Sequence, residues 1–279
     1  MRVTYHNYGA NNIDYKHTSG EIPQVDFHLH DGCEIYFLIT GDVRYFIEKK
    51  VYPLHYGDLI VTNAHEVHKP SFLSNRPYER IVINFDPEVV RPFSAPDFNL
   101  LKCFMDRPKG EQNKLTLNPK QLDEILRLFA RMEHAGRSRS KGSGILKLTA
   151  FIELLVFINR LYLNIEPGEE HSNIPEKLMP IFHYIDSHLD GDLTLEALEG
   201  MFYIDKYYLS RLFKRSTGMN VHQYILMKRI SEAKRLLSEG RSVTDACQAS
   251  GFRDYSHFIR MFKKSVGVPP GKYLRKDPQ

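Results

Sequence analysis

The spacing of apolar residues divides the chain into a strand-like part and a helix-like part. Between residues 25 and 85, short segments rich in Val, Ile, Tyr and Phe are separated by Gly, Pro, Asn and Asp. This pattern is typical of strands joined by turns, and we expect strands at residues 34–40, 43–48, 50–54, 58–62 and 80–86. Short strands without intervening helices indicate a sandwich or small barrel and disfavour a doubly wound parallel sheet. Residues 1–20 show no clear period and predict an irregular arm or an edge strand.

Helical periodicity begins after this region. We expect a short helix near residues 98–105 and amphipathic helices at residues 121–134 and 145–164, where apolar residues recur every three or four positions. Asn118 followed by Pro119 is typical of a helix N-cap with proline in the first turn. The wide apolar faces of the two longer helices leave two alternatives open, packing on the sheet or pairing with a second subunit. A homodimer is therefore a candidate assembly.

Residues 166–174 are acidic, contain Pro and Gly, and have no period, which is typical of a linker. We therefore predict a domain over residues 1–165, a linker over 166–174 and an all-helical domain over 175–279. The expected fold is an all-β barrel with appended helices, followed by an all-α domain.

The helical domain contains one unit used twice. A shift of 49 residues aligns Phe262 with Phe213, Arg260 with Arg211 and Gly267 with Gly218. Each unit has a short helix, a turn and a basic helix, the latter at residues 206–216 and 255–266. Asp205 and Asp254 are natural N-caps for the basic helices. The repeat predicts two helix-turn-helix units, joined by a long helix over residues 221–239.

One face of each basic helix carries polar and cationic side chains that suit base edges and phosphates in a major groove. The candidate DNA-binding residues are Lys206, Tyr207, Ser210, Arg211, Lys214 and Arg215 in the first unit and Tyr255, Ser256, His257, Arg260 and Lys264 in the second. The plain alternative is a helical bundle with a solvated basic face, which the duplicated unit disfavours.

Composition adds three points. A hydrophobic fraction of 42% and a charged fraction of 26% are typical of a globular protein, and neither a signal peptide nor a membrane span is expected. Three cysteines without paired spacing favour a reducing cytoplasm. Residues 175–279 hold 17 Lys and Arg against 12 Asp and Glu, so the excess positive charge lies in the helical domain, as a polyanion partner would require.

The last hundred residues resemble the DNA-binding domain of the AraC/XylS family of bacterial transcription regulators. The resemblance rests on both units; in the second the matching residues are Ala246, Gly251-Phe252, Asp254, Ser256, Phe258, Arg260, Phe262-Lys263-Lys264, Gly267, Pro270 and Tyr273. It implies double-stranded promoter DNA as a partner, and RNA polymerase as another if the protein is an activator. By analogy, Tyr207, Ser210 and Arg211 would face bases in one half-site, and Ser256, His257 and Arg260 in the other. Pro269 departs from the Thr or Ser that the family often has.

A second set of polar residues lies in the strand-rich part. His28 and His30 share a face of one strand, Glu34 follows, and His68 comes later. Histidine and carboxylate together are ligands for a divalent transition metal, so these four are candidate metal ligands. Their spacing resembles the two motifs of the cupin barrel, although Asn63-Ala64-His65 stands where the second motif has its Pro-x-Gly. The alternative is a polar pocket that binds a small-molecule effector directly, with Tyr36 and Arg44 adding contacts to His28, His30, Glu34 and His68.

Two functions of different classes follow. In the first, the protein is a sequence-specific transcription regulator, and an effector in the barrel controls how it engages DNA. The family makes a carbohydrate a reasonable effector. In the second, the barrel is a metal-dependent cupin enzyme and the helical domain only localises it. The repeated basic unit favours the regulator.

Overall fold

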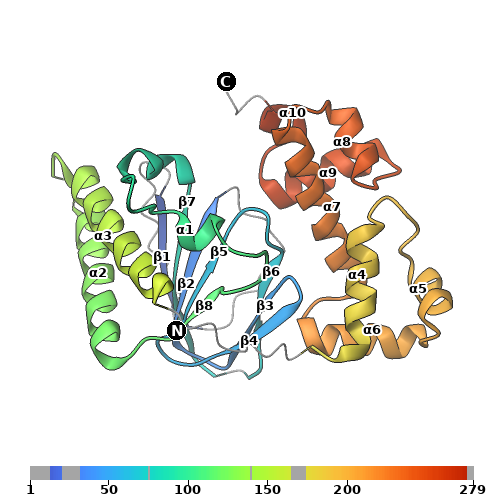
Figure 1. Cartoon of the computed structure of the whole chain (residues 1–279), viewed down its shortest axis with the longest axis horizontal. Coiled ribbons are helices and arrows are strands. Elements are labelled where there is room, and N and C mark those ends of the chain that lie inside the picture. Colours follow the sequence, from blue (N-terminus) through green and yellow to red (C-terminus); the bar gives the residue numbers. More distant parts are fainter. Residues whose placement is uncertain (1–12, 21–31, 75, 139, 165–173, 275–279) are drawn as a thin grey trace.

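The computed structural model describes residues 13–20, 32–74, 76–138, 140–164 and 174–274. Two antiparallel sheets make up the N-terminal part (Figure 1). A five-stranded sheet has the order β1-β7-β2-β5-β8, and a three-stranded sheet has the order β4-β3-β6. The strands are β1 (Ile13–Gly20), β2 (Cys33–Thr40), β3 (Val43–Ile47), β4 (Lys50–Leu54), β5 (Leu59–Thr62), β6 (His68–Phe72), β7 (Tyr78–Phe85) and β8 (Lys114–Leu115). The predicted β-rich domain is confirmed.

The two sheets enclose an interior lined by aromatic and aliphatic residues. Tyr36, Tyr45 and Tyr78 are each about 1% exposed and belong to this inner cluster, with Val43, Ile60 and Val82 among others. The opposite face of the five-stranded sheet packs on helices through a second cluster that includes Phe37, Phe85 and Phe129. Side chains alternate between the two faces of a strand, which explains why the neighbours Tyr36 and Phe37 belong to different clusters.

Helices α2 (Pro119–Arg137) and α3 (Ser143–Leu163) cover the outer face of the five-stranded sheet, next to the short α1 (Lys102–Met105). The predicted N-cap is confirmed: the Asn118 side chain accepts a hydrogen bond from the Gln121 amide, and the Gln121 side chain accepts one from the Asn118 amide. Of the two alternatives for this helix pair, packing on the sheet is therefore present in the single chain.

The C-terminal part is all-helical, as predicted. It contains α4 (Met179–Ser187), α5 (Leu195–Phe202), α6 (Lys206–Thr217), α7 (Val221–Ser238), α8 (Val243–Ala249), α9 (Tyr255–Val266) and α10 (Pro270–Tyr273). Its core also includes Phe46 and Val51 from the outer face of the three-stranded sheet, and Val67 from the turn that precedes β6. The helical part thus packs on the sheet opposite the one that carries α2 and α3 (Figure 1).

Several local expectations differ from the structure. Strands β6 and β8 and helix α10 were not expected, and Pro70 inside β6 explains why that segment does not read as a strand. A 3₁₀ turn at Glu176–Leu178 precedes α4 at the start of the helical part. Residues 13–20 form the edge strand that was one of two alternatives. The domain boundaries stay a prediction, and most of the predicted linker lies outside the described residues.

Candidate DNA-binding surface and barrel interior

The two predicted recognition helices, α6 and α9, are built alike. Each has 12 residues, starts at an aspartate N-cap and ends at a glycine in the left-handed conformation. Asp205 accepts a hydrogen bond from the Tyr208 amide, and Asp254 accepts one from the His257 amide, both at 2.7 Å. The starts of α6 and α9 are 49 residues apart, so the repeat seen in the sequence is also a structural repeat.

Buried residues anchor both helices against the core. Leu209, Leu212 and Phe213 hold α6, and Phe258 and Phe262 hold α9. The opposite faces carry the candidate DNA-binding residues. Of these, Tyr207, Arg211, Lys214, Arg215, Tyr255, Ser256, Arg260 and Lys264 are exposed, while Lys206, Ser210 and His257 are partly exposed.

The cationic side chains on these faces differ in whether they form ion pairs within the chain. The Lys206 ammonium pairs with Glu196 at 2.7 Å and lies 5.6 Å from the centre of the Tyr207 ring. Within the part of the chain that the structure describes, no ion pair engages Arg211 or Arg260. These two guanidinium groups therefore remain available to an external acceptor, and they occupy equivalent positions of the two helices.

The barrel interior brings together three of the predicted effector-binding residues. Glu34, Tyr36 and His68 are all buried, and the Tyr45 hydroxyl donates a hydrogen bond to the Glu34 carboxylate at 2.6 Å. Arg44 is not part of this group. It is exposed on the outer face of β3, because its neighbours Val43 and Tyr45 both point inward. His28 and His30 lie outside the described residues.

A row of polar side chains crosses the inner face of the five-stranded sheet. Asp14, Asn84, Glu34 and Thr62 are direct cross-strand partners on β1, β7, β2 and β5, and direct partners share a face. Three buried oxygens of this row have no hydrogen-bond partner among the described residues, namely Asp14 Oδ1, Asn84 Oδ1 and Thr62 Oγ1. Unpaired buried oxygens are costly, and this row is therefore a candidate binding surface.

Arg80 lies further along the same face of β7, two positions from Val82 and four from Asn84. Its guanidinium carbon is 5.6 Å from the centre of the Tyr36 ring and 5.3 Å from that of Tyr78, and its Nε has no hydrogen-bond partner among the described residues. The Tyr36 and Tyr78 hydroxyls are 2.9 Å apart. Burial raises the pKa of Tyr78 to about 12 and that of Tyr36 well above its ordinary value, so both stay neutral at physiological pH.

Sequence reasoning missed Arg80, Asn84, Thr62 and Asp14. Two of the three strands that carry these residues, β5 and β7, were predicted. Whether the four side chains share one face depends on the register between the strands, which only the folded sheet supplies. The period-two spacing of Arg80, Val82 and Asn84 was the available signal.

The candidate metal ligands can be tested only in part. His68 Nε2 is 3.8 Å from Glu34 Oε1, and His68 Nδ1 is 2.8 Å from the Glu66 carbonyl. A carbonyl that accepts from Nδ1 leaves Nε2 with its lone pair toward Glu34, the arrangement common in metal-bound histidine. No group of three or more ligating side chains is present among the described residues, which exclude His28 and His30. The residues that are placed fit a metal site but do not complete one.

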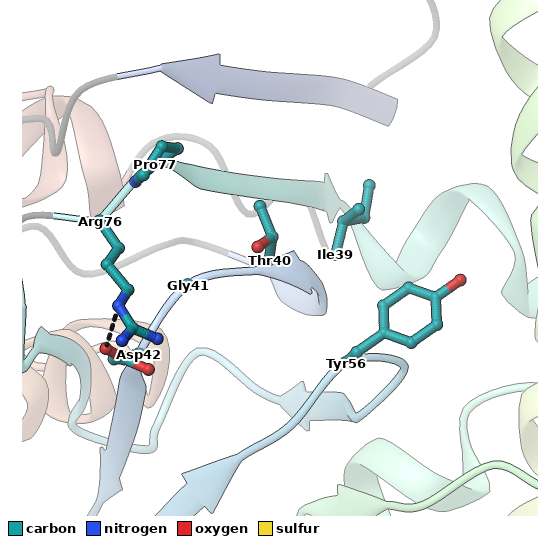
Figure 2. Close-up of a pocket in the computed structure, with 7 residues that line it drawn as sticks. All are labelled: Ile39, Thr40, Gly41, Asp42, Tyr56, Arg76 and Pro77. Atoms are coloured by element: carbon teal, nitrogen blue, oxygen red, sulfur yellow. Dashed lines mark ion pairs between the residues drawn. The ribbon is translucent and has the colours of Figure 1, made fainter.

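A cavity of about 310 Å³ opens at one end of the five-stranded sheet (Figure 2). The β2–β3 turn, Tyr56, Arg76 and Pro77 line it, and Arg76 faces Asp42 with 3.9 Å between Nε and Oδ2. Both side chains are largely exposed, and an exposed pair of this kind contributes little binding energy. The barrel interior is the better candidate for an effector site.

Comparison with known proteins identifies both parts of the chain. Residues 17–154 match the family described as an AraC-like ligand binding domain, and residues 200–276 match the family described as a helix-turn-helix domain. No helix among the described residues is long and apolar enough to cross a membrane.

Several curated proteins are similar over most of the chain. The transcriptional activator RhaR of Mannheimia succiniciproducens is 22% identical over 252 residues, which are 90% of this chain and 87% of the relative. The activator RhaS of Shigella sonnei is 24% identical over 252 residues, covering 89% and 88%. The regulator YobQ of Bacillus subtilis is 41% identical over 91 residues, covering 32% and 38%. Among solved structures, ToxT of Vibrio cholerae O395 aligns with 94% of this chain and 97% of its own, at 14% identity and a TM-score of 0.38.

Proposed function

The chain belongs to the AraC family of transcription regulators, and on this basis we propose that it binds specific promoter sequences in double-stranded DNA under the control of a small molecule held in its barrel. A ligand-binding domain followed by a helix-turn-helix domain defines the family, which is not enzymatic. The metal-dependent enzyme considered from sequence is therefore set aside. A regulator of this kind acts where the bacterial chromosome is, in the cytoplasm.

One observation supports two-site DNA reading above the others. Arg211 and Arg260 are exposed at equivalent positions of two helices that share length, cap and anchor. An arginine at such a position can donate two hydrogen bonds to the O6 and N7 of guanine. We therefore assign one half-site to α6 and the other to α9, with α7 as the connection between them.

The test uses the full chain and DNA selected from a random pool by the wild-type protein. Arg211→Ala and Arg260→Ala should each weaken binding to the selected DNA about 5- to 150-fold, because a good base contact contributes about 1–3 kcal/mol. Binding to random DNA should change far less. Arg127→Ala, an exposed arginine on α2, is the control and should leave both affinities unchanged. Full discrimination in both recognition-helix variants would contradict the assignment, and a wild-type protein whose DNA affinity did not fall with salt would contradict DNA binding itself.

For the effector we propose a hydroxyl-rich compound, with a carbohydrate as the leading class. The polar row offers acceptor oxygens that need donors, and Arg80 offers a donor that needs an acceptor. Hydroxyl groups supply both, and the Tyr36 and Tyr78 rings offer flat apolar surfaces for the carbon skeleton. The inner aromatic residues and the polar row support this class, and no ligand contact is implied for Arg44.

A panel of monosaccharides, sugar acids, amino acids and fatty acids can be screened by thermal unfolding, because a ligand that binds only the folded state raises the melting temperature. We expect the largest rise from a sugar or sugar acid. Asn84→Ala should reduce that rise, whereas Arg44→Ala on the outer face should not. A larger response to an apolar acid, or equal responses in both variants, would contradict the proposal.

We also propose that the protein is a homodimer through α2 and α3. Ile145 and Leu146 at the start of α3 are 71% and 61% exposed although the helix packs on the sheet through its other side. Contact with RNA polymerase, expected for an activator, stays a prediction.

A further inference from the structure

Strand β3 belongs to two cores at once. Tyr45 points into the barrel, where its hydroxyl donates to Glu34 at 2.6 Å and its ring stacks on His68 with 6.1 Å between ring centres. The next residue, Phe46, points outward and is 1% exposed. Its ring lies 6.2 Å from that of Phe182 and 6.1 Å from that of Tyr224, inside the helical core. Adjacent residues of one short strand therefore contact the effector site and the DNA-binding domain.

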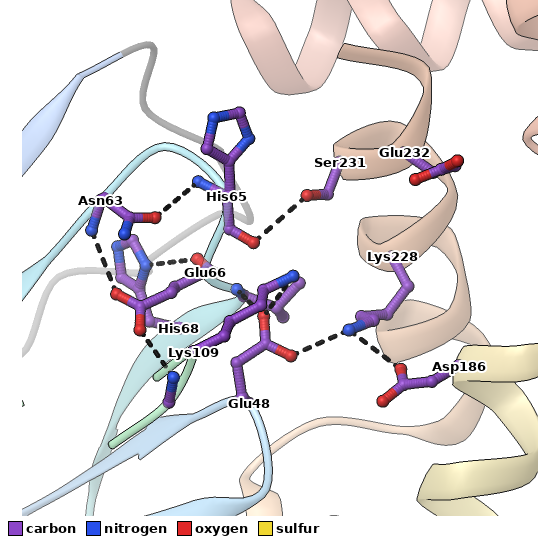
Figure 3. A network of polar contacts seen from close by, with 12 residues as sticks. Glu48, Asn63, His65, Glu66, His68, Lys109, Asp186, Lys228, Ser231 and Glu232 are labelled. Atoms are coloured by element: carbon purple, nitrogen blue, oxygen red, sulfur yellow. Dashed lines mark hydrogen bonds and ion pairs between the residues drawn. The ribbon is translucent and has the colours of Figure 1, made fainter. Parts of the chain in front are cut away.

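The turn after β3 is fixed to the helical domain by charge. The Lys228 ammonium pairs with Glu48 at 2.8 Å and with Asp186 at 2.9 Å, and Asp186 in turn pairs with Lys49 at 2.8 Å. These four residues, Glu48, Lys49, Asp186 and Lys228, are called here the interdomain cluster, and Figure 3 shows the Lys228 ammonium between Glu48 and Asp186. The Glu48 and Lys228 side chains are only 6% and 8% exposed.

Glu48 is held in place by its backbone as well. Its φ of 53° lies in the left-handed region, which non-glycine residues rarely occupy. Its Oε1 accepts a hydrogen bond from the Val67 amide at 2.7 Å, while Oε2 faces Lys228. Because Oε1 is bonded to the Val67 amide of the barrel, a movement of the turn that follows β3 would change the position of the Glu48 carboxylate relative to Lys228.

Asp186 and Lys228 stay charged across the physiological pH range, because each holds the pKa of the other on the side of its charged form. Burial alone would lower the pKa of Lys228, but Glu48 and Asp186 raise it above its ordinary value. Burial likewise would raise the pKa of Asp186, yet Lys228 and Lys49 hold it below its ordinary value. The Lys228–Asp186 pair therefore depends on the distance between its charges and is insensitive to ordinary changes of pH.

The partner of this turn is the helix that joins the two recognition units. Lys228 lies near the middle of α7, and Ser231 and Lys234 continue the same face, with 3.4 Å contacts to the His65 and Ala64 carbonyls. Strand β6 also reaches the end of α6, where a side chain added at Gly218 would lie 1.8 Å from Ser71 Oγ. The barrel thus holds the connection between the recognition helices and the end of the first one.

We propose that β3 and the interdomain cluster couple the barrel interior to α7, so that a ligand which takes over the Tyr45 bond to Glu34 shifts β3 and releases Lys228. This inference rests on the proposed function, since it takes the barrel interior as the effector site. A ligand hydroxyl competes for Glu34, Tyr45 gives up its acceptor, and Phe46 and Glu48 move with the strand. The spacing of α6 and α9 then changes through α7.

The coupling can be tested without knowing the effector. Tyr45→Phe removes the hydroxyl that binds Glu34, and hydrogen–deuterium exchange of residues 227–231 reports on α7. We expect this exchange to rise about tenfold in Tyr45→Phe. Tyr52→Phe is the matched control, because Tyr52 is the cross-strand partner of Tyr45 but donates to the Gly110 carbonyl, and it should leave α7 unchanged.

The decisive comparison repeats Tyr45→Phe in a Lys228→Met background. If the cluster carries the coupling, α7 already exchanges fast in that background and Tyr45→Phe adds nothing. Glu48→Gln, which keeps the size of the side chain, provides the same comparison should Lys228→Met fail to fold. Equal effects of Tyr45→Phe and Tyr52→Phe on the exchange of α7 would overturn the proposal. A further rise in exchange when Tyr45→Phe is added to Lys228→Met would also overturn it. Salt-dependent DNA binding by the same variants would show that the proposed function stands even then.

Discussion

Replacing Gly251 by alanine should separate the two recognition units. Gly251 lies in the turn of the second unit with a φ of +86°. An added Cβ would be 1.9 Å from the carbonyl oxygen of Leu189, which lies between α4 and α5, in the segment that leads into the first unit. That carbonyl also accepts a hydrogen bond from Arg229 Nε at 2.8 Å. The clash is with backbone, so the chain must move and this bond is lost.

The magnitude follows from two separate costs. A left-handed alanine costs about 1–2 kcal/mol, and losing a hydrogen bond to a charged group costs about 1.5–3 kcal/mol. The total is about 2.5–5 kcal/mol for Gly251→Ala. Gly267 is a matched control, because its φ is also +86° but nothing lies within 4 Å of an added Cβ. Gly267→Ala should therefore lower the free energy of unfolding only by the cost of a left-handed alanine, about 1–2 kcal/mol.

Urea unfolding of the full chain, followed by helical circular dichroism, gives both free energies. Binding to the selected DNA gives the functional consequence, which should be greater for Gly251→Ala because the first and second units lose their contact. Equal losses of stability in the two variants would refute the reasoning, since it assigns the difference to the Leu189 carbonyl alone.

Three further predictions concern the N-terminal domain. Glu66 is buried and accepts a hydrogen bond from Arg107 at 2.6 Å, and although burial alone would raise its pKa, Arg107 holds that pKa below its ordinary value. The Glu66 carboxylate therefore stabilises the fold above about pH 4.3, and this stability is lost as the pH falls through the lower pKa of the folded state. Urea titrations from pH 3 to 6 should show this decline in the wild type and its reversal in Arg107→Met. If His28, His30, Glu34 and His68 hold a metal, the alternative to the polar pocket, elemental analysis should find about one first-row metal ion per chain, lost in His68→Ala; only a trace of metal in the wild type would support the polar pocket instead. For the proposed dimer, Ile145→Lys combined with Leu146→Lys should halve the mass in sedimentation equilibrium, and an unchanged mass would exclude this interface.

Local patterns in the sequence predicted what depends on local physics. Asp254 and Asn118 are recognisable caps because capping uses residues three positions apart. The recognition helices followed from an internal repeat, and the strands at residues 34–40 and 43–48 from their composition. In each case the residues that decide the structure are neighbours in the chain.

The missing parts depend on contacts between distant residues. Glu34, Asn84 and Thr62 form one row only because three strands pair in a particular register. Phe46 is on the outer face of a barrel, where an apolar residue has no evident partner until the helical domain covers it. Lys228 is an ordinary surface residue by sequence, and two carboxylates supplied by other segments stabilise its charge in the buried position.

The burial of Phe46, Val51 and Val67 in the helical core also limits how this protein can be rearranged. A chimera that joins residues 175–279 to another sensor would leave their places in the core empty, and removing one large buried side chain typically costs about 3–5 kcal/mol. Functional exchange of the sensor therefore requires the new barrel to present apolar residues at the equivalent outer positions of β3, β4 and the β5–β6 turn. The hydrophobic core of the DNA-binding domain therefore includes residues of the barrel, and a functional exchange has to keep these residues together with residues 175–279.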